Sequence, residues 1–143
     1  MIEVGRACDV GASPSAVWAV LADFAAISSW AANVDHSCLM SDQTEGVGMV
    51  RRIQTGRTTL RERVLTWGPP TSLSYALEGL PPVVRSATNT WTVEATPSGS
   101  RVSLTSRVDA GPRPPQQLVA KVVGHKLGQA SDQLIAGLKA KVS

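Results

Sequence analysis

The sequence is poor in aromatic side chains and in charge. Only one of its 143 residues is a phenylalanine and one a tyrosine, beside four tryptophans, and charged residues make up 17%. Low charge combined with 43% hydrophobic residues excludes an intrinsically disordered chain, which has the opposite balance. The length is that of one ordinary domain, so we expect residues 1–143 to fold as a single domain around one hydrophobic core.

Cysteine and long apolar runs are also scarce. The only cysteines, Cys8 and Cys38, lack a CxxC spacing, and we expect both to be reduced. No segment approaches the roughly 18 consecutive apolar residues of a membrane span. Residues 1–6 alternate polar with apolar side chains, unlike a signal peptide. We therefore expect a cytoplasmic protein without membrane insertion.

The net positive charge is small, and the arginines are not interspersed with aromatic residues, so the sequence does not predict binding of nucleic acid. The isoelectric point is about 9.2, but the formal net charge is only +3. Five arginines gather between positions 51 and 63, with no aromatic residues between them to stack on bases. Alternate arginines on a strand usually form a solvated face, so we expect no nucleic-acid partner.

Motifs for several kinds of chemistry are missing. The chain has no GxSxG, no HExxH and no glycine-rich phosphate loop. His36, His125, Cys8 and Cys38 are too scattered along the sequence to suggest a zinc site. We therefore expect neither a metal nor a cofactor.

What the sequence does contain is a clear change of hydrophobic period. Residues 2–10 alternate as a strand, and Ser13-Pro14 supply a helix N-cap and a first helical position. Helical spacing continues from there, with a second short helical piece that ends near Trp30. The period then becomes two, in six runs separated by turn residues: 34–41, 47–55, 58–67, 71–79, 86–96 and 101–109.

A long amphipathic helix is predicted at the C-terminal end. It follows the proline cluster at 112–115, and its apolar stripe runs from Leu118 to Leu138. Consecutive strands joined by short turns favour an antiparallel meander. We therefore predict an α+β fold with a seven-stranded antiparallel sheet, two short helices after the first strand, and a long C-terminal helix.

This order of elements is accompanied by several short sequence segments that are typical of a known superfamily. Segment 12–24 reads Ala-Ser-Pro-Ser-Ala-Val-Trp-Ala-Val-Leu-Ala-Asp-Phe and is followed by Trp30 and Val34. Further phrases are Glu62-Arg63-Val64, Trp67-Gly68-Pro69-Pro70 and Leu73-Ser74-Tyr75. Together they resemble the START-like superfamily, also called SRPBCC or helix-grip proteins, in its polyketide cyclase/dehydrase and lipid-transport branch.

The resemblance spans nearly the whole chain and implies both a fold and a class of function. In helix-grip proteins a curved sheet grips the C-terminal helix and leaves a deep pocket. Different members use that pocket for lipids, hormones, polyketide cyclisation or quinone binding. A fold of this kind does not by itself decide among these activities.

Strand 58–67 predicts an inward-facing carboxylate. Arg61 and Arg63 favour water, which turns Leu60, Glu62 and Val64 toward the helix. A carboxylate in an apolar cavity needs a cation or a proton, and Arg51 shares a face with Met49 and Ile53. Arg51 and Glu62 are therefore either a ligand-anchoring or acid–base pair, or a salt bridge in water; we favour the latter.

Other polar side chains are candidates of the same kind. Tyr75 and Asn89 share the inward faces of their strands with apolar residues, where each either contacts a ligand or satisfies a core hydrogen bond. His36 lies on the run 34–41 on the same face as Val34, Cys38 and Met40, where an imidazole is able to act as acid or base. A structural role for His36 is the simpler interpretation.

The remaining ligand-binding candidates are mostly apolar. The predicted set is Trp30, Met49, Arg51, Glu62, Tyr75, Asn89, Trp91, Gly124, Leu127 and Gly128. Trp30, at the end of the helical pair, is expected to line an entrance, while most tryptophans pack in the core. Gly124 and Gly128 lie one turn apart on the last helix, where they either leave cavity volume or let the sheet approach closely.

Three functions remain open at this point. The first is binding or transport of a small hydrophobic molecule of lipid, polyketide or isoprenoid type, without catalysis. The second is a polyketide cyclase or dehydratase in which Glu62, His36 or Tyr75 moves protons. The third is a regulatory protein whose arginine face docks a partner. The sequence does not separate a monomer from a weak dimer.

Overall fold

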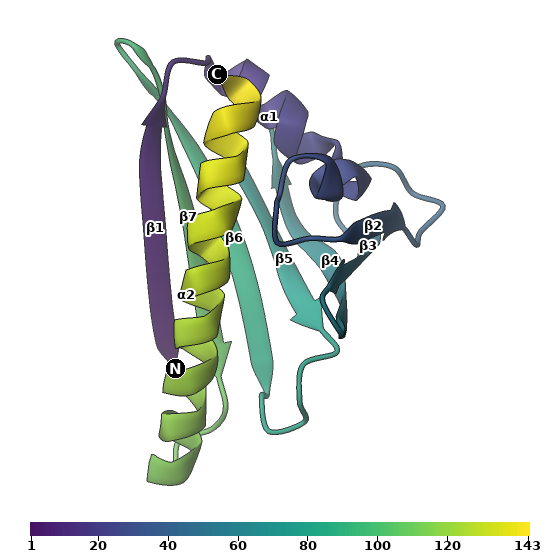
Figure 1. Ribbon diagram of the computed structural model, residues 1–143, viewed down its shortest axis with the longest axis vertical. Coiled ribbons are helices and arrows are strands. Elements are labelled where there is room, and N and C mark those ends of the chain that lie inside the picture. The colour runs from purple at the N-terminus through teal and green to yellow at the C-terminus, as the bar shows by residue number, and fades with distance from the viewer.

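The computed structural model describes residues 1–143 and shows one continuous seven-stranded sheet with a long helix against it (Figure 1). All neighbouring strands pair antiparallel, in the spatial order β1-β7-β6-β5-β4-β3-β2. The elements are β1 (Ile2–Val10), α1 (Pro14–Ala22), the 3₁₀ helix η1 (Phe24–Ser29), β2 (His36–Leu39), β3 (Val50–Thr55), β4 (Thr58–Gly68), β5 (Ser72–Glu78), β6 (Ser86–Thr96), β7 (Gly99–Asp109) and α2 (Pro114–Val142). This confirms the predicted α+β helix-grip fold.

The short helices begin as the sequence predicts. Ser13 is the N-cap of α1, its Oγ accepting a hydrogen bond from the Ala16 N–H at 3.2 Å, and Pro14 occupies the first position. Val17 and Leu21, one turn apart, form the buried face of α1. The chain then continues into η1, whose Phe24 and Ile27 are also buried. The helical pair therefore closes over one part of the sheet.

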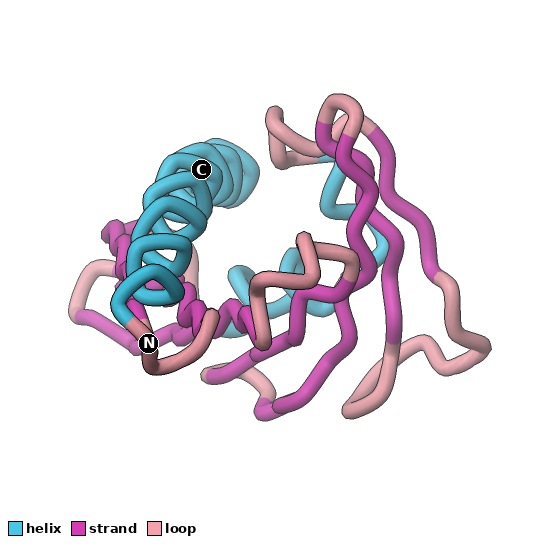
Figure 2. The backbone as a smooth tube through the Cα atoms, turned by 90° about the horizontal axis from the view of Figure 1, so that it is seen from below, coloured by secondary structure: helices cyan, strands magenta, loops and turns pink.

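The helix α2 packs against the β1 and β7 side of the strongly curved sheet (Figures 1 and 2). Its buried residues recur at helical spacing: Ala120, Gly124, Gly128, Ser131, Leu134, Ile135 and Leu138. No helix of the protein is long and apolar enough to cross a membrane. Because α2 lies over β1 and β7, strands β3 to β5 are left to face the space beside the helix.

The first strand of the meander differs from its prediction. Run 34–41 shortens to β2, and the N–H of Val34 bonds to the Ala31 carbonyl at 3.0 Å as part of a turn. The alternation is therefore broken between Val34, which is buried, and His36, which is exposed. Ser37 points inward instead, and its Oγ donates to the Ala25 carbonyl at 2.6 Å. The prediction that His36 shares the face of Val34 is wrong.

The tryptophans mostly belong to the core, as expected. Trp18 packs edge-on against Trp67, with ring centroids 5.1 Å apart, and Trp30 packs edge-on against Trp91 at 6.2 Å. The Nε1 of Trp30 is buried and has no hydrogen-bond partner in the protein. Trp30 therefore packs on the core near Trp91, and it does not line the cavity that lies beside α2.

Candidate functional site

A cavity of about 300 Å³ lies beside α2, against the inner face of β3 to β6. Its walls are predominantly apolar: Ile27, Val34, Ile53, Leu60, Leu77, Leu127, Ala130 and Leu134. Three buried polar residues, Glu62, Tyr75 and Asn89, line the same cavity. Cavities with apolar walls and a few fixed polar groups are the usual form of small-molecule sites.

Glu62, the carboxylate in the cavity wall, forms a buried ion pair with Arg51. Arg51 on β3 is directly opposite Glu62 on β4, and both side chains are almost inaccessible to solvent, at 3% and 4% exposed. The Nε of Arg51 donates to Glu62 Oε1 at 2.8 Å, and its Nη2 lies 2.7 Å from the same oxygen. Our preferred interpretation, a salt bridge in water, is wrong, because the pair is enclosed by the core.

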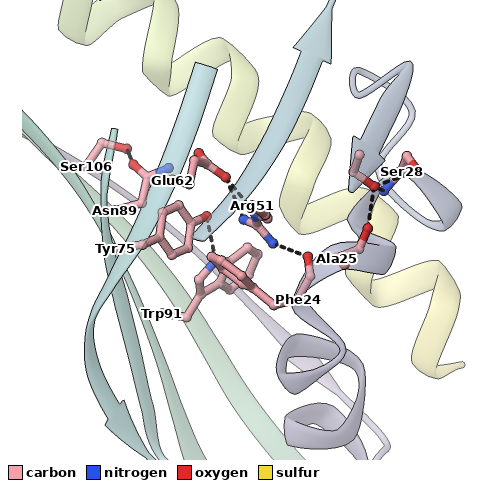
Figure 3. Close-up of polar contacts among 10 residues, drawn as sticks. Phe24, Ala25, Ser28, Arg51, Glu62, Tyr75, Asn89, Trp91 and Ser106 are labelled. Atoms are coloured by element: carbon pink, nitrogen blue, oxygen red, sulfur yellow. Dashed lines mark hydrogen bonds and ion pairs between the residues drawn. The ribbon is translucent and has the colours of Figure 1, made fainter. Parts of the chain in front are cut away.

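Arg51 is held by a second set of contacts from η1. Its Nη1 donates to the Phe24 carbonyl at 2.8 Å (Figure 3). Its Cζ lies 3.7 Å from the centroid of the Phe24 ring and 4.8 Å from that of Tyr75. All three guanidinium nitrogens therefore contact protein groups, and Arg51 is not part of the cavity wall. Its position supports Glu62 and does not present a free cation to a ligand.

Tyr75 and Asn89 stand side by side across the sheet. Tyr75 on β5 pairs with Asn89 on β6, which in turn pairs with Ser106 on β7. The Oγ of Ser106 donates to Asn89 Oδ1 at 2.6 Å, and Trp91 Nε1 donates to the Tyr75 hydroxyl oxygen at 3.2 Å (Figure 3). Trp91 thus lies behind Tyr75 as a support and does not line the cavity.

We call Glu62, Tyr75 and Asn89 the inner polar group. Each member has one hydrogen-bonding function that no protein group uses. Glu62 Oε2 accepts no hydrogen bond, and the Tyr75 hydroxyl oxygen accepts from Trp91 while its O–H donates none. Asn89 Nδ2 carries two N–H groups, of which at most one is directed at the Tyr75 oxygen, so the other is unused. Since all three residues line the cavity, these unused functions are available to a molecule inside it.

The environment of Tyr75 keeps its phenol protonated. Burial raises the pKa of Tyr75 above its ordinary value of 10.0, and the negative charge of Glu62 raises it further. The nearby Arg51 charge and the side chains of Trp91 and Asn89 act in the opposite direction, with smaller effect. At neutral pH, Tyr75 is therefore a hydrogen-bond donor and not a base.

The raised pKa gives a direct test, because Tyr75 is the only tyrosine of the chain. An acid whose pKa is raised on folding favours the folded state below its unfolded pKa. That contribution is lost as pH rises from about 10 through the folded pKa. We expect phenolate absorbance at 295 nm to stay absent as the native protein is titrated past pH 10 and to appear only with alkaline unfolding.

The matching experiment uses the unfolded chain as reference. In denaturant, the same tyrosine is expected to titrate near the ordinary value of 10.0. Tyr75→Phe should remove the absorbance change and leave the protein less sensitive to pH in this range. Phenolate appearing near pH 10 while the fold is intact would contradict the burial of the Tyr75 hydroxyl.

Of the ten predicted ligand-binding residues, four line the cavity: Glu62, Tyr75, Asn89 and Leu127. Met49 is buried in the core at 1% exposure. A Cβ at Gly124 would lie 3.0 Å from Ile2 Cγ2, and one at Gly128 would lie 3.0 Å from Val4 Cγ1. The two glycines therefore allow close approach of β1 and leave no ligand volume.

The other candidate groups lie away from the cavity. His36 is exposed on β2 and does not contribute to the cavity wall, which removes it from the set of acid–base candidates. No three His, Cys, Asp or Glu side chains lie together as a metal site. Arg61 and Arg63 are exposed as predicted, but each faces Glu78, at 3.8 and 3.2 Å. This shared carboxylate weakens the arginine face as a docking surface for an acidic partner.

Several lining residues escaped the sequence analysis. Lys126 lines the cavity from α2 and forms no ion pair, and Thr55 and Thr58 are exposed residues of its wall. Asn33, in the turn before β2, has a buried Oδ1 with no hydrogen-bond partner. In the sequence, a lysine on a helix and threonines beside a turn are indistinguishable from a solvated surface.

Comparison with protein families gives one match over the whole chain. The family model described as "Polyketide cyclase / dehydrase and lipid transport" matches residues 1–143. No curated protein sequence matches the chain. The family match covers every element that forms the cavity.

Solved structures share the fold at low sequence identity. The Zhui aromatase/cyclase from Streptomyces sp. R1128 superposes with a TM-score of 0.80 at 16% identity, over 99% of this chain and 93% of that one. The protein XoxI from Bacillus cereus gives 0.77 at 18% identity, over 99% and 96%. The di-domain aromatase/cyclase StfQ from the steffimycin biosynthetic pathway gives 0.80 at 14%, over 99% of this chain and 50% of that one. These likenesses establish the fold.

Proposed function

We propose that this chain, which belongs to the polyketide cyclase / dehydrase and lipid transport family, binds a small hydrophobic molecule in the cavity beside α2. The observation that carries the proposal is the combination of a mostly apolar wall with three buried polar residues that keep unused hydrogen-bonding functions. Burial of apolar ligand surface, at about 25 cal/mol per Å², supplies most of the affinity. The polar residues then fix the orientation of the ligand.

The binding experiment fills the cavity with a side chain. Ala130 lines the cavity from α2, and Ala130→Trp is expected to place an indole in the space that a ligand needs. We expect the neutral probe N-phenyl-1-naphthylamine to bind the natural protein with one-to-one stoichiometry and enhanced fluorescence. In Ala130→Trp, its affinity should fall by about tenfold or more, equivalent to at least about 1.4 kcal/mol.

A matched control lies on the exposed face of the same helix. Ala136 is exposed, so Ala136→Trp adds the same indole to α2 without entering the cavity. This variant should bind the probe as the natural protein does. Equal affinity of all three proteins would place the probe elsewhere, and no binding by the natural protein would remove the proposal.

A second candidate function is proton transfer on a bound polyketone. It is favoured by the carboxylate of Glu62 and the neutral phenol of Tyr75 on one cavity wall. In this alternative, Glu62 takes a proton from the carbon beside a ketone while Tyr75 donates a hydrogen bond to the carbonyl oxygen. Two relatives in fold are described as aromatase/cyclases.

Turnover separates this alternative from binding alone. A synthetic linear triketone is incubated with the natural protein, and formation of an aromatic ring is followed by absorbance. Catalysis predicts that Glu62→Gln loses turnover and retains N-phenyl-1-naphthylamine binding. If the natural protein binds the probe but gives no ring closure above the buffer rate, the chain is a binding protein for such molecules.

A further inference from the structure

We propose that the inner polar group selects a neutral hydroxyl-bearing hydrophobic molecule, held with its hydroxyl against Glu62, Tyr75 and Asn89, over a carboxylate of the same size. The proposal rests on the proposed binding function and names the chemical class of the ligand. It follows from the hydrogen-bonding functions that the protein leaves unused at the inner wall.

The unused functions include both a hydrogen-bond acceptor and hydrogen-bond donors. Glu62 Oε2 is an acceptor, because Arg51 occupies only Oε1. Asn89 Nδ2 is a donor, because Ser106 fixes the amide by donating to Oδ1. The phenol of Tyr75 supplies a second donor, since its oxygen already accepts from Trp91. A hydroxyl is the simplest group that donates one hydrogen bond and accepts others, so it satisfies this arrangement.

A ligand carboxylate does not fit the same place. Every nitrogen of Arg51 is engaged by Glu62 or by the Phe24 carbonyl, so no free cation lies at the inner wall. The incoming carboxylate would instead face the buried carboxylate of Glu62 (Figure 3). Two like charges in a desolvated site repel each other, and the second would need a proton to enter.

A purely apolar ligand is also disfavoured. It would shield Glu62 Oε2 and Asn89 Nδ2 from solvent and offer them no hydrogen bond in return. Charge on the ligand is tolerated only at the other end of the cavity, where Thr55, Thr58 and Lys126 are exposed. The two ends of the cavity therefore differ chemically: a buried carboxylate and amide lie at one end, and an exposed lysine and threonines lie at the other.

Three naphthalene probes test the selection. At pH 7, 2-naphthol is neutral and carries a hydroxyl, naphthalene carries no polar group, and 2-naphthoate is an anion. Each competes with N-phenyl-1-naphthylamine for the natural protein. We expect 2-naphthol to bind at least about tenfold more tightly than either of the other two, because 2-naphthoate turned with its carboxylate toward Lys126 would place only its apolar rings against Glu62 and Asn89.

Substitution of the carboxylate should change this order. Glu62→Gln removes the negative charge and leaves the positive charge of Arg51, so the preference for 2-naphthol over 2-naphthoate should shrink about tenfold or more. Glu78→Gln is the matched control, because Glu78 lies on β5 outside the cavity, beside Arg61 and Arg63. The Glu78→Gln variant should prefer 2-naphthol over 2-naphthoate by the same factor as the natural protein.

The outcomes separate the two proposals. If N-phenyl-1-naphthylamine binds in the cavity while naphthalene or 2-naphthoate matches 2-naphthol, or while none of the three displaces it, the hydroxyl proposal is overturned and binding stands. If no probe binds, including N-phenyl-1-naphthylamine, the binding function itself is overturned. Should Glu62→Gln be too unstable to measure, the order among the three probes on the natural protein still decides.

Discussion

Replacing Arg51 by methionine is expected to lower the free energy of unfolding by about 3–5 kcal/mol, because it leaves the carboxylate of Glu62 buried without a cation. The expectation depends on burial of both partners, at 3% and 4% exposed. The substitution also removes the hydrogen bond to the Phe24 carbonyl and the contact with the Phe24 ring. Urea unfolding, with the slope held common to both proteins, measures the difference.

The control removes both charges together. In the double variant Arg51→Met with Glu62→Leu, no buried charge remains, and side chains of similar length occupy the space. We expect the double variant to recover more than half of the stability lost in Arg51→Met, while it loses any preference for 2-naphthol. A single variant as stable as the natural protein would show that water reaches the pair.

The Arg51–Glu62 pair also shows how far the sequence alone could go. Alternation along β4 placed Arg61 and Arg63 outside and Glu62 inside, and the same rule placed Arg51 on the inward face of β3, beside Glu62. Alternation does not predict whether solvent reaches the inward face that carries Arg51 and Glu62. The answer depends on Phe24, which lies 27 residues before Arg51 and covers it from η1.

The error at His36 has a different physical cause. Alternation of polar and apolar residues predicts which side chains face inward only where the backbone stays extended. The turn at Val34 changes which residues face inward before β2 begins. The sequence therefore predicted the strand and misassigned its inward side. Ser37, the residue after His36, is the one that points inward, and it joins β2 to η1 through the Ala25 carbonyl.

The cavity wall could be predicted only in part. Tyr75 and Asn89 were found because each is a polar residue among inward apolar neighbours on a regular strand. Lys126 and Asn33 were missed, because they reach the cavity through the curvature of the sheet and the placement of α2 over β1 and β7. Neither property is encoded in a local pattern of hydrophobicity.

The glycines of α2 lead to the second large effect. Gly137→Ala is expected to destabilise the protein by about 1–3 kcal/mol, although alanine favours a helix by about 0.5–1 kcal/mol over glycine. A Cβ at position 137 would overlap the carbonyl oxygen of Trp30. That oxygen belongs to the backbone at the end of η1, so relief requires a shift of the chain and not a change of rotamer.

Gly124→Ala is the matched control in the same helix. Its Cβ would meet Ile2 Cγ2 at 3.0 Å, a side-chain atom of the first residue of β1. A small movement of Ile2 relieves this contact, so the gain in helix propensity should keep the variant within about 1 kcal/mol of the natural protein. Thermal and urea unfolding of both variants make the comparison. Equal stability of the two would mean that η1 yields as easily as a side chain, and that α2 and η1 are not rigidly packed.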